Sequence, residues 1–165
     1  MPNDSLETTF RPLKWLCLSV LILVMDQLSK RWAVANLSDG SVVDLLPIFN
    51  FELVYNTGAA FSFLAGMGGW QQILFTVIAI AVCLALVFAI KLAKTDEKQL
   101  VIAYACVIGG ALGNVVDRIT LGKVVDFIHF FYQNWHFPYF NIADIAIFIG
   151  AVLMIMDAFK WRLIK

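Results

Sequence analysis

Residues 100–118, LVIAYACVIGGALGNVVDR, decide how this chain folds. The run carries no charged residue before Asp117 and Arg118, and it contains Gly109 and Gly113 at a GxxxG spacing. An apolar run of this kind predicts a membrane-crossing helix, since a crossing takes about 20 residues. The glycines predict a close-packed face inside a helical bundle. The charged pair at the end needs a reason, because a charge at bilayer depth costs a few kcal/mol.

Three further apolar runs flank this one. The four runs cover about residues 13–35, 70–90, 100–119 and 142–159. Of 165 residues, 61% are hydrophobic and 15% are charged, and the mean hydropathy is +0.83. This composition predicts an all-α membrane protein, a bundle of four transmembrane helices in a single domain over residues 1–165. The net charge is zero and no basic cluster is interleaved with aromatic residues, which argues against a nucleic-acid partner.

Two segments between the runs are too polar to cross a membrane. Residues 36–69 contain a short alternating stretch, Ile48 to Tyr55, which ends at the turn-forming Asn56-Thr57-Gly58. This pattern predicts a small extracytoplasmic β cradle that rests on the membrane. Residues 120–140 are rich in aromatic residues but are interrupted by Asp126 and other polar residues. They predict an aromatic loop at the membrane interface.

The lysine and arginine residues favour one side of the membrane. They concentrate in the N-terminal flank, in the link around Lys94 and in the C-terminal tail, whereas residues 36–69 have none. The positive-inside rule then predicts both termini in the cytoplasm and residues 36–69 and 120–140 outside. Ala33-Val34-Ala35 imitates a signal-peptide cleavage site, but polar residues from Asp26 onward separate it from the apolar run. We therefore expect an uncleaved first span.

Several polar residues inside the predicted spans can be explained by structural roles. Asp26 and Lys30 are four residues apart, so they share one helix face and predict a structural ion pair. Asn114, Asp117 and Arg118 follow an i, i+3, i+4 spacing along the outer turn of their helix. Adjacent helical side chains diverge, so we expect Arg118 to reach a carboxylate or a carbonyl elsewhere in the bundle.

Asp126 and Asp144 form a candidate catalytic pair. Asn141-Ile142-Ala143-Asp144 fits a helix N-terminus with an acidic first turn, so capping and catalysis are equally supported at Asp144. Asp126 lies in the apolar stretch Val124 to Ile128, which has no cap pattern. Two carboxylates that approach each other cannot both ionise freely. One then serves as a base and the other as an acid, which is the arrangement of aspartic proteases.

Other functions find less support. Asp126, His129 and His136 are the only plausible metal cluster, but the histidines are seven residues apart and no HExxH motif is present, so we expect no metal or cofactor. The sequence also lacks a GxSxG elbow, a phosphate-binding glycine loop, and the GxGD motif of presenilin-type and prepilin proteases. A small transporter would spread polar residues across the bilayer and often shows an internal repeat. Here the polar residues collect at the outer end.

The chain resembles the lipoprotein signal peptidase family, also called signal peptidase II. Five blocks carry the resemblance, in the order of the family: DQxxK at 26–30, YNTGAAFS at 55–62, GAxGNxxDR at 110–118, VVDF at 124–127 and FNxAD at 140–144. Each block alone is weak, but the five together at family-like spacing are specific. No motif position departs from the family pattern.

The resemblance implies an aspartic endopeptidase of the bacterial inner membrane that works without a cofactor. Its substrates would be prolipoproteins, cut just before a cysteine that already carries diacylglycerol. The resemblance makes Asp126 and Asp144 catalytic. It assigns the support of the substrate or of this pair to Asn56, Gly58, Asn114, Arg118 and Asn141, and a structural polar role to Asp26, Lys30 and Asp117. Membrane lipid would surround the enzyme, and the cyclic peptide globomycin would inhibit it.

Overall fold

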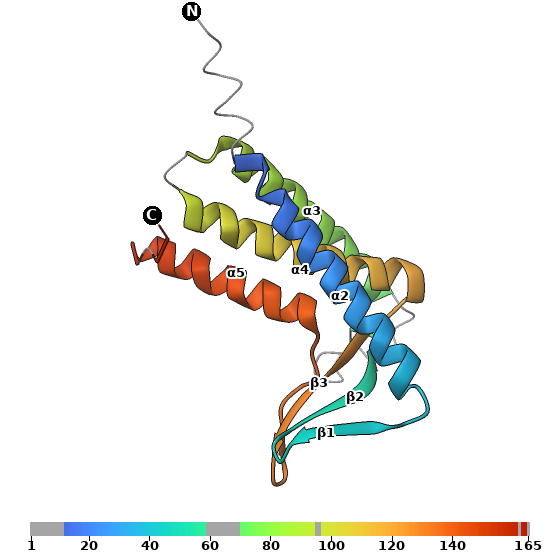
Figure 1. The fold of residues 1–165 in the computed structure, drawn as a ribbon. Coiled ribbons are helices and arrows are strands. Elements are labelled where there is room, and N and C mark those ends of the chain that lie inside the picture. The colour runs from blue at the N-terminus through green and yellow to red at the C-terminus, as the bar shows by residue number, and fades with distance from the viewer. Residues whose placement is uncertain (1–11, 59–69, 95–96, 162, 165) are drawn as a thin grey trace, which may run out of the picture.

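A computed structural model describes residues 12–58, 70–94, 97–161 and 163–164 (Figure 1). Its long helices and strands follow one another along the chain. They are α2 (Leu16–Leu37), β1 (Val42–Leu46), β2 (Phe49–Asn56), α3 (Trp70–Leu92), α4 (Lys98–Leu121), β3 (Val124–Tyr132), β4 (Trp135–His136) and α5 (Ile142–Ala158). The helices agree with the four predicted apolar runs to within a few residues at each end.

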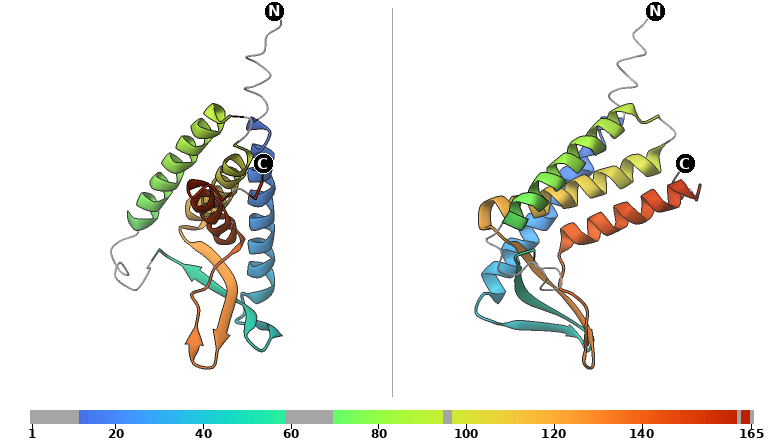
Figure 2. Two further views of the ribbon diagram at one scale, coloured as in Figure 1. Left: turned by 90° about the vertical axis from the view of Figure 1, so that its left-hand side faces the viewer. Right: turned by 180° about the vertical axis from the view of Figure 1, so that it is seen from behind.

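Helix α4 lies at the centre of the bundle and packs against α2, α3 and α5. Figure 2 shows α4 between α2 and α3. Its glycines permit this close packing. A Cβ atom on Gly109 would lie 2.8 Å from the Ser19 carbonyl oxygen of α2, and one on Gly110 would lie 2.3 Å from the Ala143 carbonyl oxygen of α5. The prediction that these glycines pack inside the bundle is confirmed.

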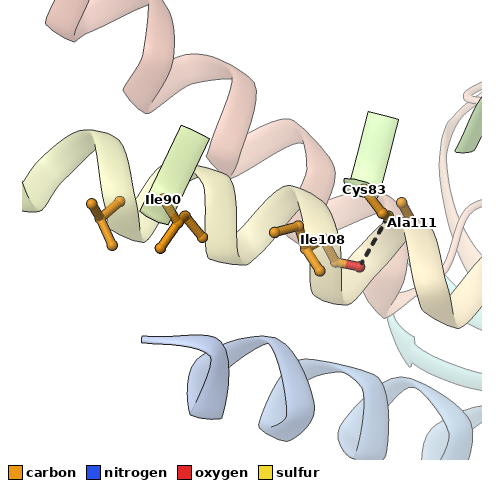
Figure 3. Close-up of a cluster of buried hydrophobic side chains, with 5 residues drawn as sticks. Cys83, Ile90, Ile108 and Ala111 are labelled. Carbon is orange, nitrogen blue, oxygen red and sulfur yellow. Dashed lines mark hydrogen bonds between the residues drawn. The ribbon is translucent and has the colours of Figure 1, made fainter. Parts of the chain in front are cut away.

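A hydrophobic cluster joins α3 to α4 (Figure 3). Cys83 and Ile90 of α3 are buried against Val101, Ile108 and Ala111 of α4. The Cys83 sulfur lies 3.9 Å from the Ile108 carbonyl oxygen. Cys83 and Ile90, like Val101 and Ile108, are seven residues or about two helical turns apart, so one apolar stripe of each helix packs against the other.

The outer surface of the helices is apolar. Among the described residues, α3 and α4 are long and hydrophobic enough to cross a membrane, and only a small part of α3 is buried inside the protein. Large side chains such as Ile73, Leu84 and Phe88 are more than half exposed on α3. An apolar helix that leaves such side chains uncovered fits a lipid environment better than water. The crossing of the membrane by all four helices stays a prediction.

The strands form one antiparallel sheet in the order β1-β2-β3-β4 at one end of the bundle (Figure 1). Strands β1 and β2 confirm the β structure predicted between residues 36 and 58, whereas residues 59–69 lie outside the described residues. The position of this cradle outside the cytoplasm and on the membrane stays a prediction. Residues 120–140 differ from the expected aromatic loop, because Val124–Tyr132 and Trp135–His136 are strands. The reason is backbone pairing: β3 lies along β2, and Phe140 pairs with Ile128. The protein is therefore a helical bundle with a four-stranded sheet and not purely α-helical.

Candidate active site

Strand β3 and helix α5 bring Asp126 and Asp144 to the same region. Asp126 is the third residue of β3, pairs with Val54 of β2 and is 2% exposed. Asp144 is the third residue of α5 and completes a capping box with Asn141, so the predicted cap is confirmed. Capping still leaves one oxygen of Asp144 for a second partner. We call these two residues the aspartate pair.

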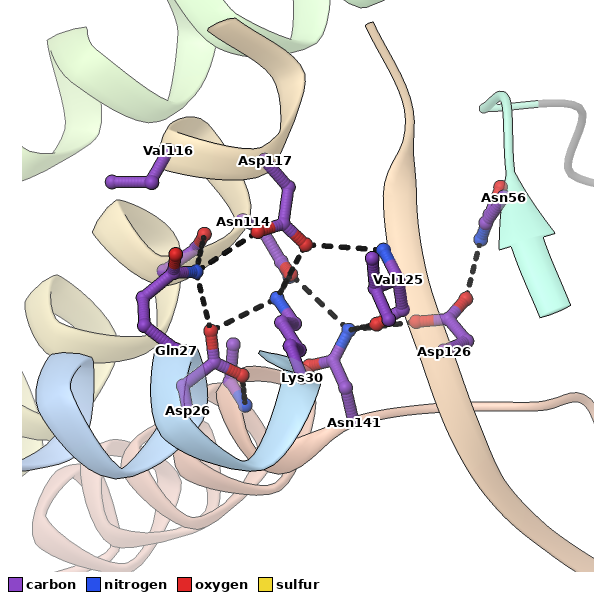
Figure 4. Close-up of polar contacts among 12 residues, drawn as sticks. Asp26, Gln27, Lys30, Asn56, Asn114, Val116, Asp117, Val125, Asp126 and Asn141 are labelled. Carbon is purple, nitrogen blue, oxygen red and sulfur yellow. Dashed lines mark hydrogen bonds and ion pairs between the residues drawn. The ribbon is translucent and has the colours of Figure 1, made fainter. Parts of the chain in front are cut away.

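Asn141 connects the aspartate pair, and Figure 4 shows its bond to Asp126. Its side-chain amide donates a hydrogen bond of 2.6 Å to Oδ1 of Asp126. Its side-chain oxygen accepts from the Asp144 backbone amide at 3.0 Å, and its own backbone amide donates to Oδ2 of Asp144 at 3.2 Å. One residue at the start of α5 therefore fixes the carboxylate of the strand relative to that of the helix.

Asn56 and Asn114 hold the remaining oxygens of the aspartate pair. The Asn56 amide donates to Oδ2 of Asp126 at 3.0 Å, and the Asn114 amide donates to Oδ1 of Asp144 at 2.8 Å. Asn56 itself is fixed by the backbone amide of Gly58, which donates to its side-chain oxygen at 2.8 Å. Gly58 has a φ of +78°, a conformation that side chains other than glycine rarely adopt. These predicted supporting residues thus reach the pair directly or through one hydrogen bond.

Beside the pair lies a second polar group, the lysine cluster, made of Asp26, Gln27, Lys30 and Asp117 (Figure 4). The Lys30 ammonium lies 2.9 Å from a carboxylate oxygen of Asp26 and 2.9 Å from one of Asp117. It also donates to the Asn114 side-chain oxygen at 2.9 Å. The predicted ion pair of Asp26 with Lys30 is confirmed, and it is buried.

The lysine cluster also fixes the backbone beside each catalytic candidate. Asp117 accepts from the Val125 backbone amide at 3.0 Å, one residue before Asp126. Asp26 accepts from the Ala143 backbone amide at 2.9 Å, one residue before Asp144. Gln27 adds a bond of 2.9 Å to Asp117. Sequence reasoning gave Gln27 no role, although its place in the motif next to Asp26 was a signal.

Arg118 points away from the lysine cluster toward α3. Its guanidinium lies over the Phe75 ring, 5.8 Å from the ring centroid. Its Nε atom is buried without a hydrogen-bond partner. The contact of Arg118 with a carboxylate or a carbonyl elsewhere in the bundle stays a prediction, since the described contact of its guanidinium is with the Phe75 ring.

The two carboxylates differ from those of the lysine cluster in charge compensation. Among the described residues, neither Asp126 nor Asp144 has a lysine or arginine nitrogen within 4.0 Å. The pKa of Asp126 is raised from 3.8 to about 6, mainly by burial and also by the nearby charge of Asp144, against the lowering effect of the hydrogen bonds from Asn56 and Asn141. A carboxyl with this pKa can hold a proton near neutral pH, which is what an acid–base pair requires.

The two histidines lie farther along the sheet. His129 and His136 contact each other through ring nitrogens 3.1 Å apart, and His129 also contacts the Asn50 side-chain oxygen at 3.0 Å. The Tyr139 ring stacks on His129, and its hydroxyl donates to Glu52 at 2.7 Å. The ring nitrogens of His129 are thus directed at other protein groups, and Asp126 is held by asparagines. In the part of the chain that the structure describes, no three His, Cys, Asp or Glu residues are grouped to hold a metal.

Known proteins share this sequence pattern. A family model described as signal peptidase (SPase) II matches residues 18–160. A lipoprotein signal peptidase of Shewanella amazonensis is 50% identical over 148 residues, covering 90% of this chain and 88% of that protein. The lipoprotein signal peptidase of Pseudoalteromonas atlantica is 48% identical and covers 90% of each chain.

Solved structures share the fold. One, described as a bacterial membrane enzyme determined by the in meso method at 1.9 Å resolution, has a TM-score of 0.78 and 30% identity, and covers 94% of this chain and 97% of that chain. A second, described in the same way at 2.3 Å, has a TM-score of 0.75 and 28% identity, and covers 96% of this chain and 98% of that one.

Proposed function

Because the chain belongs to the signal peptidase II family, which cleaves the signal peptides of prolipoproteins, we propose that Asp126 and Asp144 are its catalytic residues. The observation that carries this proposal is the bridge made by Asn141, which holds both carboxylates at once. Two carboxylates fixed to one asparagine, without an ion pair to any lysine or arginine of the described residues, favour proton exchange over a purely structural role.

The proposed reaction needs one proton on the aspartate pair. The ionised carboxylate takes a proton from a water molecule as the water attacks the scissile carbonyl carbon. The protonated carboxyl donates to the carbonyl oxygen, and a proton then passes to the departing amine as the C–N bond breaks. We assign the shared proton to Asp126 in the substrate-free protein, since burial raises the pKa of this carboxyl to about 6.

The proposed substrate is a prolipoprotein whose cysteine already carries diacylglycerol, cut just before that cysteine. The exposed apolar side chains of α3 support the approach of a lipid-bearing substrate from the membrane. Globomycin, a cyclic peptide, would compete with this substrate for the same residues. We propose no cofactor.

The proposed topology has four membrane crossings, both termini in the cytoplasm, and the sheet and the aspartate pair near the extracytoplasmic face. The start of α2, the link between α3 and α4, and the end of α5 lie at one end of the bundle, opposite the sheet (Figure 1). Lysines gather at that end: Lys14, Lys91, Lys94, Lys98 and Lys160. This distribution supports the orientation under the positive-inside rule. The polar residues gather at the sheet end, which favours a peptidase site over a transport path.

Cleavage by the purified protein tests the proposal. Wild type, Asp126→Asn and Asp144→Asn are compared in detergent on a diacylglyceryl-modified prolipoprotein and on its unlipidated precursor. We expect wild type to cut only the lipidated form and both variants to lose activity. EDTA should change nothing. Activity lost in EDTA and restored by zinc, or a well-folded variant with near-full activity, would contradict the aspartic mechanism.

A further inference from the structure

The side-chain carboxamide of Gln72 is buried without a hydrogen-bond partner. Within the described residues, three buried side-chain atoms lack a partner: Nε2 and Oε1 of Gln72, and Nε of Arg118. Gln72 is the third residue of α3 and is 9% exposed. Buried polar groups in native proteins are nearly always paired, because an unmade hydrogen bond leaves the cost of desolvation uncompensated. Two such residues in one place therefore need an explanation.

Gln72 and Arg118 both lie close to Phe75 of α3. The Arg118 guanidinium lies over the Phe75 ring, 5.8 Å from the ring centroid. A Cβ atom on Gly58 would lie 3.0 Å from Nε2 of Gln72 and 3.2 Å from the Phe75 ring. Gly58 in turn binds Asn56, which binds Asp126. The Gln72 amide is thus separated from a catalytic carboxylate by Gly58 and Asn56 alone.

This chain does satisfy a buried glutamine elsewhere. Gln99, at the opposite end of the bundle, is 1% exposed. Its amide donates to the carbonyl oxygens of Leu153 and Trp161, and its side-chain oxygen accepts from the Leu163 backbone amide at 2.7 Å. The contrast indicates that Gln72 lacks partners because of its position beside the aspartate pair.

The chemistry of the carboxamide selects its partner. Neither the donor Nε2 nor the acceptor Oε1 of Gln72 has a hydrogen-bond partner, so a single group that offers both an acceptor and a donor would pair the whole carboxamide. A backbone peptide unit offers both, whereas the ester groups of a diacylglyceryl chain offer only acceptors. We propose that the Gln72 carboxamide binds one backbone peptide unit of the signal peptide near the scissile bond. This inference rests on the proposed function. Because both atoms are covered in the substrate-free protein, binding requires the Phe75 ring or the turn at Gly58 to shift.

Replacement of Gln72 by leucine separates binding from stability. Gln72→Leu removes two unpaired polar atoms, so its melting temperature should equal or exceed that of wild type. Loss of contacts to the substrate should lower kcat/KM by about tenfold, mainly through KM, since the contact is made before and during the reaction alike. The matched control, Gln99→Leu, should lower the melting temperature and leave kcat/KM per folded molecule unchanged. Gln72→Met provides a second variant if the leucine variant does not accumulate.

Substrates in which single amides are replaced by esters locate the contact. In wild type, the ester should lower kcat/KM at one position before the cleavage site, and in Gln72→Leu the same ester should have no effect there. An equal effect of every ester on both proteins, or a leucine variant with lower stability and normal kcat/KM, would overturn the inference. Either outcome would leave the proposed function intact, provided that wild type cleaves the substrate and Asp126→Asn does not. Failure of wild type to cleave would remove both.

Discussion

The lysine cluster and the aspartate pair are neighbours, and each contains two carboxylates. Figure 4 shows the cluster beside Asp126. The two groups differ in how they compensate buried charge. In the lysine cluster, Lys30 lies 2.9 Å from both Asp26 and Asp117. In the pair, the described residues that hold the carboxylates of Asp126 and Asp144 are asparagines, which donate amide hydrogen bonds. A carboxylate beside a cation stays ionised and supports the structure. A carboxylate held by neutral donors can change its protonation state at little cost to its geometry.

The difference shows why the same residue type serves two purposes in one region. The oxygens of Asp26 and Asp117 fix the backbone amides of Ala143 and Val125, next to the catalytic candidates. These bonds support a positioning role for the lysine cluster, and we propose that proton exchange is confined to the aspartate pair. We therefore expect substitutions in the cluster to act on stability and substitutions in the pair to act on activity.

Asp126→Asn should produce the largest effect on activity and should not lower stability above pH 6. The proposed acid–base role predicts a fall in kcat of about 10³-fold or more. The folded-state pKa of Asp126 is about 6, above the reference value of 3.8, so its contribution to stability is present below 3.8 and lost as the pH rises through 6. Above that pH the wild type bears the cost of an ionised buried carboxylate and the variant does not. Melting temperatures measured across this pH range, beside cleavage rates, test both statements.

Lys30→Met should produce the largest effect on stability. It leaves Asp26 and Asp117 buried without a cation, a change that costs about 3–5 kcal/mol. Thermal unfolding in detergent measures the loss. Arg31→Met is the matched control: Arg31 is adjacent and exposed, so its replacement should change stability by less than about 0.5 kcal/mol. Equal melting temperatures for the two variants would mean that the cluster does not stabilise the bundle.

Gly113→Ala should have a smaller effect on the same cluster. The new Cβ atom would lie 2.5 Å from Oδ2 of Asp26 and 3.3 Å from the Ala143 side chain. Alanine favours a helix by about 1 kcal/mol over glycine. The contact with a fixed carboxylate outweighs this gain, so we expect a net loss of about 1–2 kcal/mol. A melting temperature above that of wild type would show that α2 can move away from α4 at no cost.

Sequence reasoning succeeded where a local pattern determines the structure. The four apolar runs predicted the four helices, the spacing of Asp26 and Lys30 predicted their ion pair, and Asn141 with Asp144 predicted the cap. Each of these depends on residues within one turn or one run of the chain. The motif blocks also identified the residues that now surround Asp126.

The sequence could not predict contacts between distant segments. Strand β3 was expected as a loop, since its apolar residues show no alternation: both faces of Val124–Ile128 are buried. Its partner, β2, is about 70 residues away in the chain, as the register of Val54 with Asp126 shows. The bonds from Asp117 to Val125 and from Asp26 to Ala143 likewise depend on the tertiary fold. Motif spacing alone does not reveal which backbone amide a buried carboxylate will accept.

The pH dependence of cleavage tests whether neutral donors set the protonation of the aspartate pair. In wild type, kcat/KM should fall as the pH rises through the pKa of Asp126, which is about 6 in the substrate-free protein, because the pair then loses its shared proton. The hydrogen bond from Asn56 favours the ionised form and lowers this pKa. Asn56→Ala should therefore move the alkaline limb to higher pH by about one unit, along with a lower maximal rate. Asn36→Ala, an exposed asparagine that binds the Trp32 carbonyl, should leave the profile unchanged. If the alkaline limb of kcat/KM lies at the same pH in Asn56→Ala as in wild type, Asp126 does not carry the shared proton. The proposed contrast in protonation between the lysine cluster and the aspartate pair would then rest on Asp144 alone.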